Sequence, residues 1–345
     1  MISSVAKDLS RRVFVATRTA RTAALHLGYA AYQRTLRKPA NPTHKAQVAL
    51  QKRLAALFDQ DWADAEAGHY PRDLTSGLPW REYGGVLPKL LADLPRTRQR
   101  ILDRNFSDLD EAAAPERYPH YYARNFHFQS EGYLGHRSAE LYDLQVELLF
   151  GGTADVMRRR LVPPVVRFVR EQGHSRARPA KVIDIACGTG HLLKMLGRAL
   201  PDAQLTGVDL SPHYVARARS LLPRELNVSL MVENAESLPY PDGHFDAATN
   251  VFLLHELPTD VRARIVAEMA RVVRPGGLVV LADSLQLADA PELEAELRAF
   301  PEAFHEPYYL SYLRDDLAAR MREANLEVIE EGAHFLTKVV AARKR

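Results

Sequence analysis

The pattern of apolar and polar residues along the chain changes near residue 180. Before that point, apolar residues recur every three or four positions, which is typical of helices that bury one face. The segment 137–152 repeats leucines at this spacing and ends in a Gly-Gly pair that stops a helix. A further helix is predicted over 154–172, where a Pro-Pro pair kinks or divides it. We therefore expect residues 1–175 to form an all-helical N-terminal domain.

Beyond residue 180, short segments rich in β-branched residues alternate with amphipathic helices. This alternation, with nearly continuously apolar strands, predicts a parallel sheet covered by helices on both faces. Only residues 331–333 separate the last two strands, so these strands should form a hairpin. The expected fold class is α/β, with a seven-stranded sheet of six parallel strands and one antiparallel strand over residues 176–345. The predicted strands span 181–186, 203–209, 228–233, 245–251, 277–283, 326–331 and 334–342.

Composition narrows the class of protein. The 345 residues are 46% hydrophobic and 26% charged, which is typical of a globular chain. No apolar run approaches the roughly 20 residues that span a bilayer, and arginines interrupt the N-terminal segment where a signal peptide would be apolar. The single cysteine, Cys187, excludes an internal disulfide and a cysteine-based metal site. We expect a cytoplasmic protein without a metal site.

The net charge of +3 is unevenly distributed, because residues 1–60 contain 11 Lys or Arg and only two acidic residues. A basic amphipathic segment can contact an acidic partner or a membrane surface, here through residues 1–40. Alternatively, an apolar stripe packs on the rest of the protein and leaves the arginines in water. We favour this second interpretation. The stripe would consist of Val5, Leu9, Val13, Ala16, Ala20 and Leu27.

The segment "VIDIACGTGH", residues 182–191, predicts a strand, a tight turn and a helix. Gly188 and Gly190 allow a sharp turn and close approach of a ligand, because neither carries a Cβ. In an open α/β sheet, ligands bind beyond the carboxyl ends of the strands. The dinucleotide fingerprint requires a third small residue where this chain has Leu193, so a pyrophosphate is disfavoured.

Polar residues lie in or after three successive strands. Asp184 can order the amides of the turn and face the cationic end of an amino-acid-bearing cofactor. Asp209 follows Gly190 by 19 residues, where a carboxylate accepts both hydroxyls of a ribose. Asn234 can accept from an adenine amino group, and the amide of Ala235 can donate to a ring nitrogen. The pattern indicates an adenosyl cofactor.

The motifs "VIDIACGTG", "GVDLSPHYV", "ENAESLPYPDGHFDAATNVFLLHELP" and "RVVRPGGLVVLAD" resemble the class I S-adenosylmethionine (SAM)-dependent methyltransferases. Over residues 180–345 the chain is similar to their small-molecule branch, typified by ubiquinone/menaquinone C-methyltransferases. The resemblance implies a Rossmann-like methyltransferase sheet, SAM as cofactor and S-adenosylhomocysteine (SAH) as product. Asn234 stands where the family commonly has Asp, so we expect somewhat weaker cofactor binding. The expected cofactor-binding residues are Asp184, Ala186, Gly188, Gly190, Asp209, Leu210, Asn234, Ala235, Asn250 (through its backbone) and Tyr133.

Two stretches predict the substrate side of the site. His255, beside Glu256 and just beyond the fourth strand, is the best general-base candidate; alternatively, it caps the next helix or orders the loop. The segment 118–138 is rich in aromatic and polar residues, including a second catalytic candidate, His127, and fits either a substrate pocket or an interdomain surface. A similar cluster over 299–315 could form the opposite wall. Cys187 we interpret as a small space-filling residue rather than a nucleophile.

These observations favour a SAM-dependent methyltransferase acting on a small, aromatic or quinone-like substrate, with residues 1–175 as a substrate cap. One alternative is a nucleic-acid-modifying methyltransferase that uses the basic N-terminal arm. Its arginines are interspersed with Ala and Leu rather than stacking aromatics, and the Asn/Asp-Pro-Pro-aromatic tetrapeptide is absent. We therefore expect no nucleic-acid partner. The other alternative is a noncatalytic SAM-binding protein. The acceptor atom, the substrate and the oligomeric state stay open.

Overall fold

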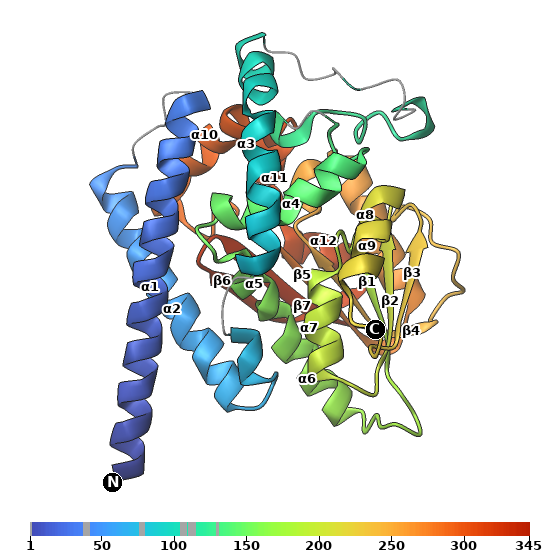
Figure 1. The fold of residues 1–345 in the computed structure, drawn as a ribbon. Coiled ribbons are helices and arrows are strands. Elements are labelled where there is room, and N and C mark those ends of the chain that lie inside the picture. The colour runs from blue at the N-terminus through green and yellow to red at the C-terminus, as the bar shows by residue number, and fades with distance from the viewer. Residues whose placement is uncertain (1, 37–41, 76–79, 104–108, 110–114, 129–130) are drawn as a thin grey trace.

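The computed structural model describes residues 2–36, 42–75, 80–103, 109, 115–128 and 131–345 (Figure 1). The described part before residue 172 is helical, as the spacing of apolar residues predicts. Residues 159–161 form a 3₁₀ turn, after which the Pro-Pro pair begins the next helix, where proline costs no hydrogen bond. The helices are α1 (Ile2–Leu36), α2 (His44–Glu66), α3 (Trp80–Asp103), α4 (His136–Leu149), α5 (Ala154–Arg158) and α6 (Val162–Glu171).

The second half of the chain forms one seven-stranded sheet in the order β3-β2-β1-β4-β5-β7-β6. Strands β3 to β5 pair in parallel, and β7 is antiparallel to both of its neighbours. The prediction of six strands in one direction and one reversed is confirmed. The strands are β1 (Lys181–Ile185), β2 (Gln204–Asp209), β3 (Val228–Val232), β4 (Phe245–Val251), β5 (Val273–Ser284), β6 (Leu326–His334) and β7 (Thr337–Lys344).

The final hairpin is present, but the prediction that residues 331–333 form its turn is wrong. β6 continues through these residues to His334, with an irregularity between Val328 and Glu330. The turn lies at Phe335 and Leu336 instead, where Phe335 has a left-handed φ of 59°. The Phe335 side chain is buried among helix residues, which compensates for this conformation.

Different helices cover the two faces of the sheet. Val182 of β1 packs in one cluster with Phe168 of α6, whereas Ile183 points to the other face and packs with Met269. Helix α6 thus lies on the sheet although it precedes residue 175; the division of the chain at that residue stays a prediction. The sheet-associated helices are α7 (His191–Ala199), α8 (Pro212–Leu221), α9 (Thr259–Val272), α10 (Glu294–Phe304), α11 (Tyr309–Tyr312) and α12 (Leu317–Glu323).

Helix α1 is oriented differently from the favoured interpretation, which is wrong. Its inward side carries Phe14 and Val15, which pack against the cluster formed by α2 and Phe335, while Arg18 and Arg21 line a cavity of about 340 Å³ and Arg11 pairs with Asp59 of α2 at the surface. Leu9, Val13 and Leu27 are 62%, 57% and 74% exposed, and Ala16 and Ala20 are also exposed; the Val5 side chain lies outside the described residues. The apolar contact of α1 is thus made by a different side of the helix from the predicted stripe.

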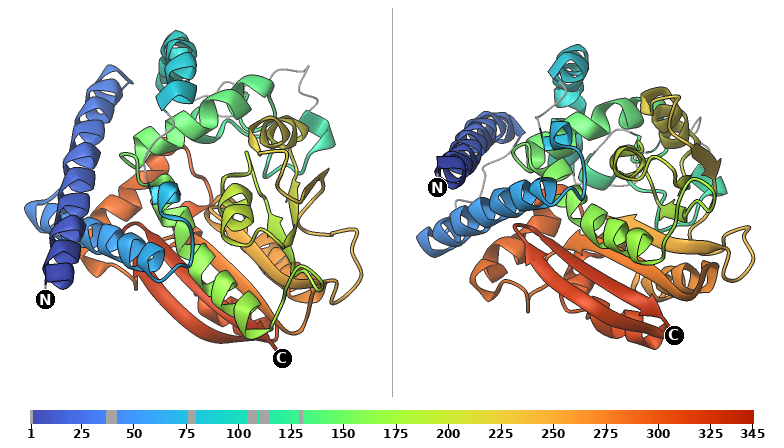
Figure 2. Two further views of the ribbon diagram at one scale, coloured as in Figure 1. Left: turned by 60° about the horizontal axis from the view of Figure 1, so that its bottom comes forward. Right: turned by 90° about the horizontal axis from the view of Figure 1, so that it is seen from below.

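Helix α2 (blue) lies beside the β6–β7 edge of the sheet (red) in Figure 2 and contacts β6. Buried ion pairs hold this arrangement. Asp61 of α2 accepts two hydrogen bonds from Arg159, at 2.8 and 2.9 Å, and one from Tyr70 at 2.9 Å. Among the described residues, every helix is too short or too polar to cross a lipid bilayer.

Two aspartates of α2 provide a matched test of this packing. We expect Asp61→Ala to lower the free energy of unfolding by about 3–5 kcal/mol, because it leaves the buried Arg159 guanidinium unpaired. Asp59→Ala removes only the exposed pair with Arg11 and should cost less than about 1 kcal/mol. Urea denaturation followed by circular dichroism measures both values. Equal losses in the two variants would contradict the buried role of Asp61.

Candidate cofactor and substrate site

The turn between β1 and α7 is built from left-handed backbone. Ala186, Gly188 and Gly190 have φ values of 55°, 54° and 84°. Gly190 starts α7, and a Cβ there would lie 3.3 Å from the Cβ of Ala218, so a larger residue would crowd helix α8. Cys187 is 8% exposed, its thiol lies beneath the turn toward Gly207, and burial raises its pKa well above the ordinary value. This placement agrees with a space-filling role.

A cavity of about 100 Å³, here named the cofactor cavity, opens above this turn. It contains seven of the ten expected cofactor-binding residues, which come from the ends of β1, β2 and β3 and from the segment before α4. Those seven are Ala186, Gly188, Asp209, Leu210, Asn234, Ala235 and Tyr133.

The remaining three expected residues lie elsewhere. Asp184 lines a smaller extension of the cavity together with Gly188. Gly190 lines a different cavity, the one of about 340 Å³ that Arg18 also lines. Asn250 lines none of the described cavities; its side chain donates to the carbonyl of Ile185 at 2.7 Å and thereby joins β4 to β1. The residues that follow Asn250, Val251 and Phe252, line the cofactor cavity and its extension, and backbone binding by Asn250 itself stays a prediction.

Asp209 connects the first two strand ends. Its carboxylate accepts hydrogen bonds from the amides of Gly188 and Ser211, both at 2.9 Å. Burial raises the pKa of Asp209 to about 6. The two hydrogen bonds favour the charged form and oppose part of this rise. The lone pairs that remain can accept ribose hydroxyls. The Asn234 oxygen accepts from the amide of Glu236 at 2.9 Å and retains capacity for one further donor.

Asp184 lies at the inner end of the cavity. The side chain is 2% exposed and accepts a hydrogen bond from Thr249 at 2.8 Å. Burial raises the pKa of Asp184 to about 7. Arg158 lines the same extension and pairs with Asp155 at 2.7 Å, so a carboxylate and a guanidinium face the space where a zwitterionic ligand end fits. The sequence signal for Arg158, three consecutive arginines at 158–160, did not distinguish it from surface residues.

A second cavity of about 220 Å³, here named the substrate cavity, adjoins the first. Tyr142, Phe252 and Glu256 line both cavities. Most of the other lining residues are apolar and come from α2, α4, α10 and α11. They are Leu50, His127, Val146, Leu149, Phe150, His255, Ser284, Leu293, Glu296, Leu297, Phe300, Tyr309 and Leu336.

His255 lines the substrate cavity, in the position that the sequence predicts. Its Nδ1 lies 2.6 Å from the buried carboxylate of Asp283, which also accepts from the Leu254 amide. Burial opposes a charge on the imidazole, but Asp283 raises the pKa of His255 to about 10. His255 does not cap the following helix, which begins at Thr259 without a side-chain cap. Sequence reasoning missed Asp283, although an acidic residue near the end of a fifth strand repeats the pattern of the first two.

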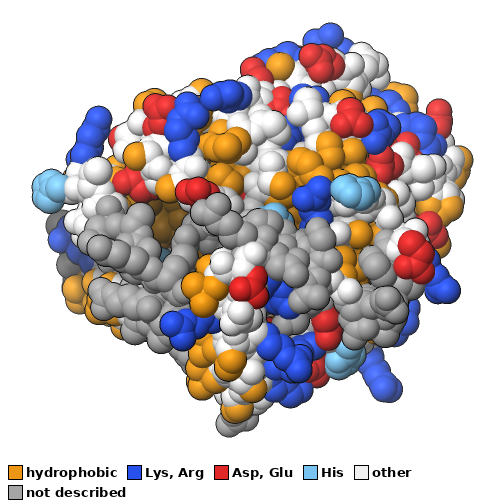
Figure 3. Space-filling model, turned by 90° about the horizontal axis from the view of Figure 1, so that it is seen from above, with side chains coloured by type: hydrophobic (Ala, Val, Ile, Leu, Met, Phe, Trp, Pro, Cys, Tyr) orange, Lys and Arg blue, Asp and Glu red, His pale blue; other side chains and the backbone are white. Residues whose placement is uncertain are grey.

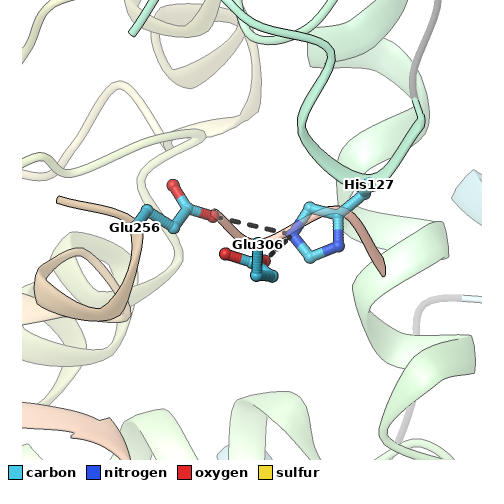
Figure 4. A group of neighbouring side chains, drawn as sticks. All are labelled: His127, Glu256 and Glu306. Carbon is cyan, nitrogen blue, oxygen red and sulfur yellow. Dashed lines mark ion pairs between the residues drawn. The ribbon is translucent and has the colours of Figure 1, made fainter. Parts of the chain in front are cut away.

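His127 meets two carboxylates at the boundary of the cavities (Figure 4). Its Nε2 lies 3.1 Å from Oε1 of Glu306 and 3.5 Å from Oε1 of Glu256. Burial alone would lower the pKa of His127, but the charges of Glu306 and Glu256 raise it. Glu306 has a fully buried side chain, and burial raises its pKa to about 7. The sequence placed Glu306 within the 299–315 cluster but did not identify it as a site residue.

The aromatic segment 118–138 contributes residues to both cavities and to packing. Tyr121, Tyr122 and Tyr133 line the cofactor cavity, and the Tyr133 hydroxyl donates to Glu256 at 2.5 Å. Phe126 stacks on Tyr133 as packing. In the second cluster, Phe300 and Tyr309 line the substrate cavity. The described aromatic and histidine members of the two clusters that line neither cavity are Tyr118, His120, Phe126, His136, Phe304, His305, Tyr308 and Tyr312.

Several known proteins are similar to this chain in sequence. Residues 182–277 match the family model described as a methyltransferase domain. The O-methyltransferase rstn1 of Aspergillus nomiae is 32% identical over 48% of this chain and 72% of its own length. Demethylmenaquinone methyltransferase of Thermus thermophilus is 35% identical over 41% of this chain, and 27-O-demethylrifamycin SV methyltransferase of Amycolatopsis mediterranei is 32% identical over 43%. The chain spans 60% and 54% of these two relatives, less than two thirds of either.

Among solved structures, magnesium protoporphyrin IX methyltransferase of Synechocystis with bound SAM is 16% identical over 55% of this chain and 81% of its own, with a TM-score of 0.39. The glycine turn, the paired strand ends and the sequence relatives together define the class. The chain belongs to the class I SAM-dependent methyltransferases, and its cofactor is SAM.

The pH dependence of cofactor binding tests the role of Asp184. Raising the pH through about 7 ionises Asp184, and the carboxylate then attracts the α-ammonium group that we expect beside it. Between pH 6 and pH 8, the affinity of the wild-type protein for SAH should rise up to about tenfold more than that of Asp184→Asn. Calorimetric titration with SAH measures both proteins, and titration of the ligand amine cancels in their ratio. Parallel pH profiles would contradict this role.

Proposed function

We propose that the protein transfers the methyl group of SAM to a small, aromatic or quinone-like substrate bound in the substrate cavity. The observation that carries this proposal is the shared wall of Tyr142, Phe252 and Glu256 between a polar cofactor cavity and a mainly apolar second cavity. An apolar, aromatic-lined cavity with few polar groups suits a flat organic molecule. Relatives named as methyltransferases of demethylmenaquinone and of a rifamycin support this substrate class.

The chemistry requires alignment of the acceptor atom with the methyl group and exclusion of water. The N-terminal helices contribute Leu50, Val146 and Leu149 to the substrate cavity, which supports a role for residues 1–175 as a substrate cap. His255, oriented through Nδ1 by Asp283, leaves Nε2 to act on the substrate, and His127 lies at the same end of the cavity.

The nucleic-acid alternative receives less support from the structure. Three arginines of α1 contact the protein, because Arg11 pairs with Asp59 and both Arg18 and Arg21 line a cavity. On the face seen in Figure 3, Lys and Arg side chains are interspersed with Asp and Glu rather than gathered into one basic patch. A nucleic-acid backbone requires a continuous basic surface.

Transfer of labelled methyl from SAM into a metabolite extract tests the proposed function. We expect SAH release and label in an apolar, aromatic fraction. Asp209→Ala should abolish both, because it removes the carboxylate that holds the turn and the ribose. Label in nucleic acid, or SAM binding without any transfer, would favour one of the two alternatives.

Two neighbouring leucines of α4 provide a matched pair for the substrate cavity. Leu149→Phe narrows the cavity and should lower kcat/KM for the labelled substrate at least about tenfold, while the affinity for SAH stays unchanged. Leu148→Phe changes a residue that packs toward Tyr83 and Leu90, away from the cavity, and should leave kcat/KM within about twofold. Equal effects of the two substitutions would place the substrate elsewhere.

We also propose that α1 contacts an anionic lipid surface through its exposed stripe. Leu9, Val13 and Leu27 form an exposed apolar face, and the flanking Lys7 and Arg12 side chains are 71% and 78% exposed. Apolar residues bordered by cations are typical of helices that lie at a membrane interface.

Co-sedimentation with vesicles tests the lipid contact. The wild-type protein should bind phosphatidylglycerol-containing vesicles more strongly than phosphatidylcholine vesicles. The double variant Leu9→Ser, Val13→Ser should lose most of this binding. The control Leu87→Ser, Leu91→Ser changes an equally spaced exposed pair on α3 and should retain it. Equal binding by both double variants would refute the proposal.

A further inference from the structure

We propose that His127, Glu256 and Glu306 bind one divalent transition-metal cation at the boundary between the cofactor and substrate cavities. A nitrogen of the imidazole and one oxygen from each carboxylate all lie within 4.8 Å of one another. The expectation of no metal site rested mainly on the single cysteine, and a site of nitrogen and oxygen donors needs no cysteine.

The two separations that involve His127 fit a shared ion. Nε2 of His127 lies 3.1 Å from Oε1 of Glu306 and 3.5 Å from Oε1 of Glu256. Donors that each lie about 2.1 Å from one ion are roughly 3 to 3.5 Å apart in tetrahedral or octahedral geometry. The three side chains converge from separate segments: the turn Phe126–Phe128, the turn Leu254–Glu256 and the residues after α10 (Figure 4).

The burial of Glu306 independently indicates a bound cation. Its side chain is fully buried, and among the described residues neither of its oxygens has a hydrogen-bond partner. His127 is its one ion-pair partner in that part of the chain, and the same Nε2 also faces Glu256. Glu256 already accepts from the Tyr133 hydroxyl, but Glu306 accepts no hydrogen bond from the described residues, and burial of an unsatisfied carboxylate is strongly unfavourable. A divalent cation would neutralise both acids and occupy the free oxygen lone pairs.

The donor set also indicates which ions to test. One imidazole and two carboxylates are borderline to hard donors, which suit Mn²⁺ or Zn²⁺. Three protein ligands leave coordination positions open. Glu256 lines both cavities and His127 lines the substrate cavity, so the open positions face the substrate.

The role of the cation in methyl transfer rests on the function proposed above. The cation would bind a substrate hydroxyl and lower its pKa, and the proton would leave to water. The oxygen then forms a bond to the methyl carbon as the carbon–sulfur bond breaks. Sulfur keeps the electron pair and becomes the neutral thioether of SAH. The site therefore favours a substrate with a hydroxyl group next to its aromatic or quinone-like ring.

Metal binding can be measured without a substrate. The full-length protein is stripped with EDTA, dialysed and titrated with Mn²⁺ or Zn²⁺ by calorimetry, and bound Mn²⁺ is counted by electron paramagnetic resonance. We expect one bound ion per chain. Glu306→Gln should weaken binding at least about 100-fold, because it removes one of three ligands. The matched control Glu302→Gln, an exposed glutamate on α10, should bind as the wild type does.

Further measurements separate loss of the ligand from loss of the fold. Circular dichroism and SAH affinity should be unchanged in Glu306→Gln. If that variant does not fold, His127→Gln removes a ligand from a different segment and should weaken binding similarly. Failure of the wild-type protein to bind either ion, or equal binding by Glu306→Gln and Glu302→Gln, would overturn the proposal. Metal binding without methyl transfer would retain the site and refute only the proposed function.

Discussion

The carboxylate of Asp209 ties together the two loops from which the cofactor cavity is built. It accepts from the amide of Gly188 in the first turn and from the amide of Ser211 at the start of α8. The Gly188 amide belongs to a turn in which Ala186 and Gly188 have left-handed backbone. The sheet supplies the rest of the constraint, since β1 and β2 pair in register up to the end of each strand. Without this bond, buried backbone donors would be left unsatisfied and the turn would lose its shape.

Buried charges are concentrated where the two cavities meet. Asp283 orients His255, Tyr133 donates to Glu256, and Glu306 lies fully buried beside His127. Such an arrangement costs desolvation free energy, which a core of apolar residues would avoid. The cost is offset only by hydrogen bonds, by opposite charges or by a bound ion. Polar groups therefore accumulate at one end of a cavity that is otherwise apolar, where a substrate can be oriented.

The helices before residue 172 are held to the sheet by charge as well as by apolar packing. Asp61 pairs with Arg159 while Asp64 pairs with Arg160, and both carboxylates belong to α2. Because the arginines lie between α5 and α6, these pairs connect the outer helix to the helix that packs on the sheet. This connection brings Leu50 and the residues of α4 over the substrate cavity. Apolar packing and these ion pairs thus join the helices before residue 172 to the sheet.

The succession of strands along the chain and the glycine turn could be predicted from the sequence. Short β-branched runs alternating with helices predict the sheet, and the glycines with Asp184 and Asp209 predict the cofactor turn, because these features depend on neighbouring residues and on one local periodicity. The reversed last strand follows from the missing helix before it. Only the position of its turn differed, because the burial of Phe335 depends on distant helices.

Tertiary structure alone decided which distant residues meet. Glu306 approaches Glu256 and His127 from segments 50 and 179 positions away in the chain (306 − 256 and 306 − 127). Asp283 reaches His255, and α1 packs through Phe14 and Val15 rather than through the predicted stripe, for the same reason. Local periodicity shows that a helix has two faces, but the free energy of burying either face depends on the partner that it meets. That partner is set by the packing of the whole chain.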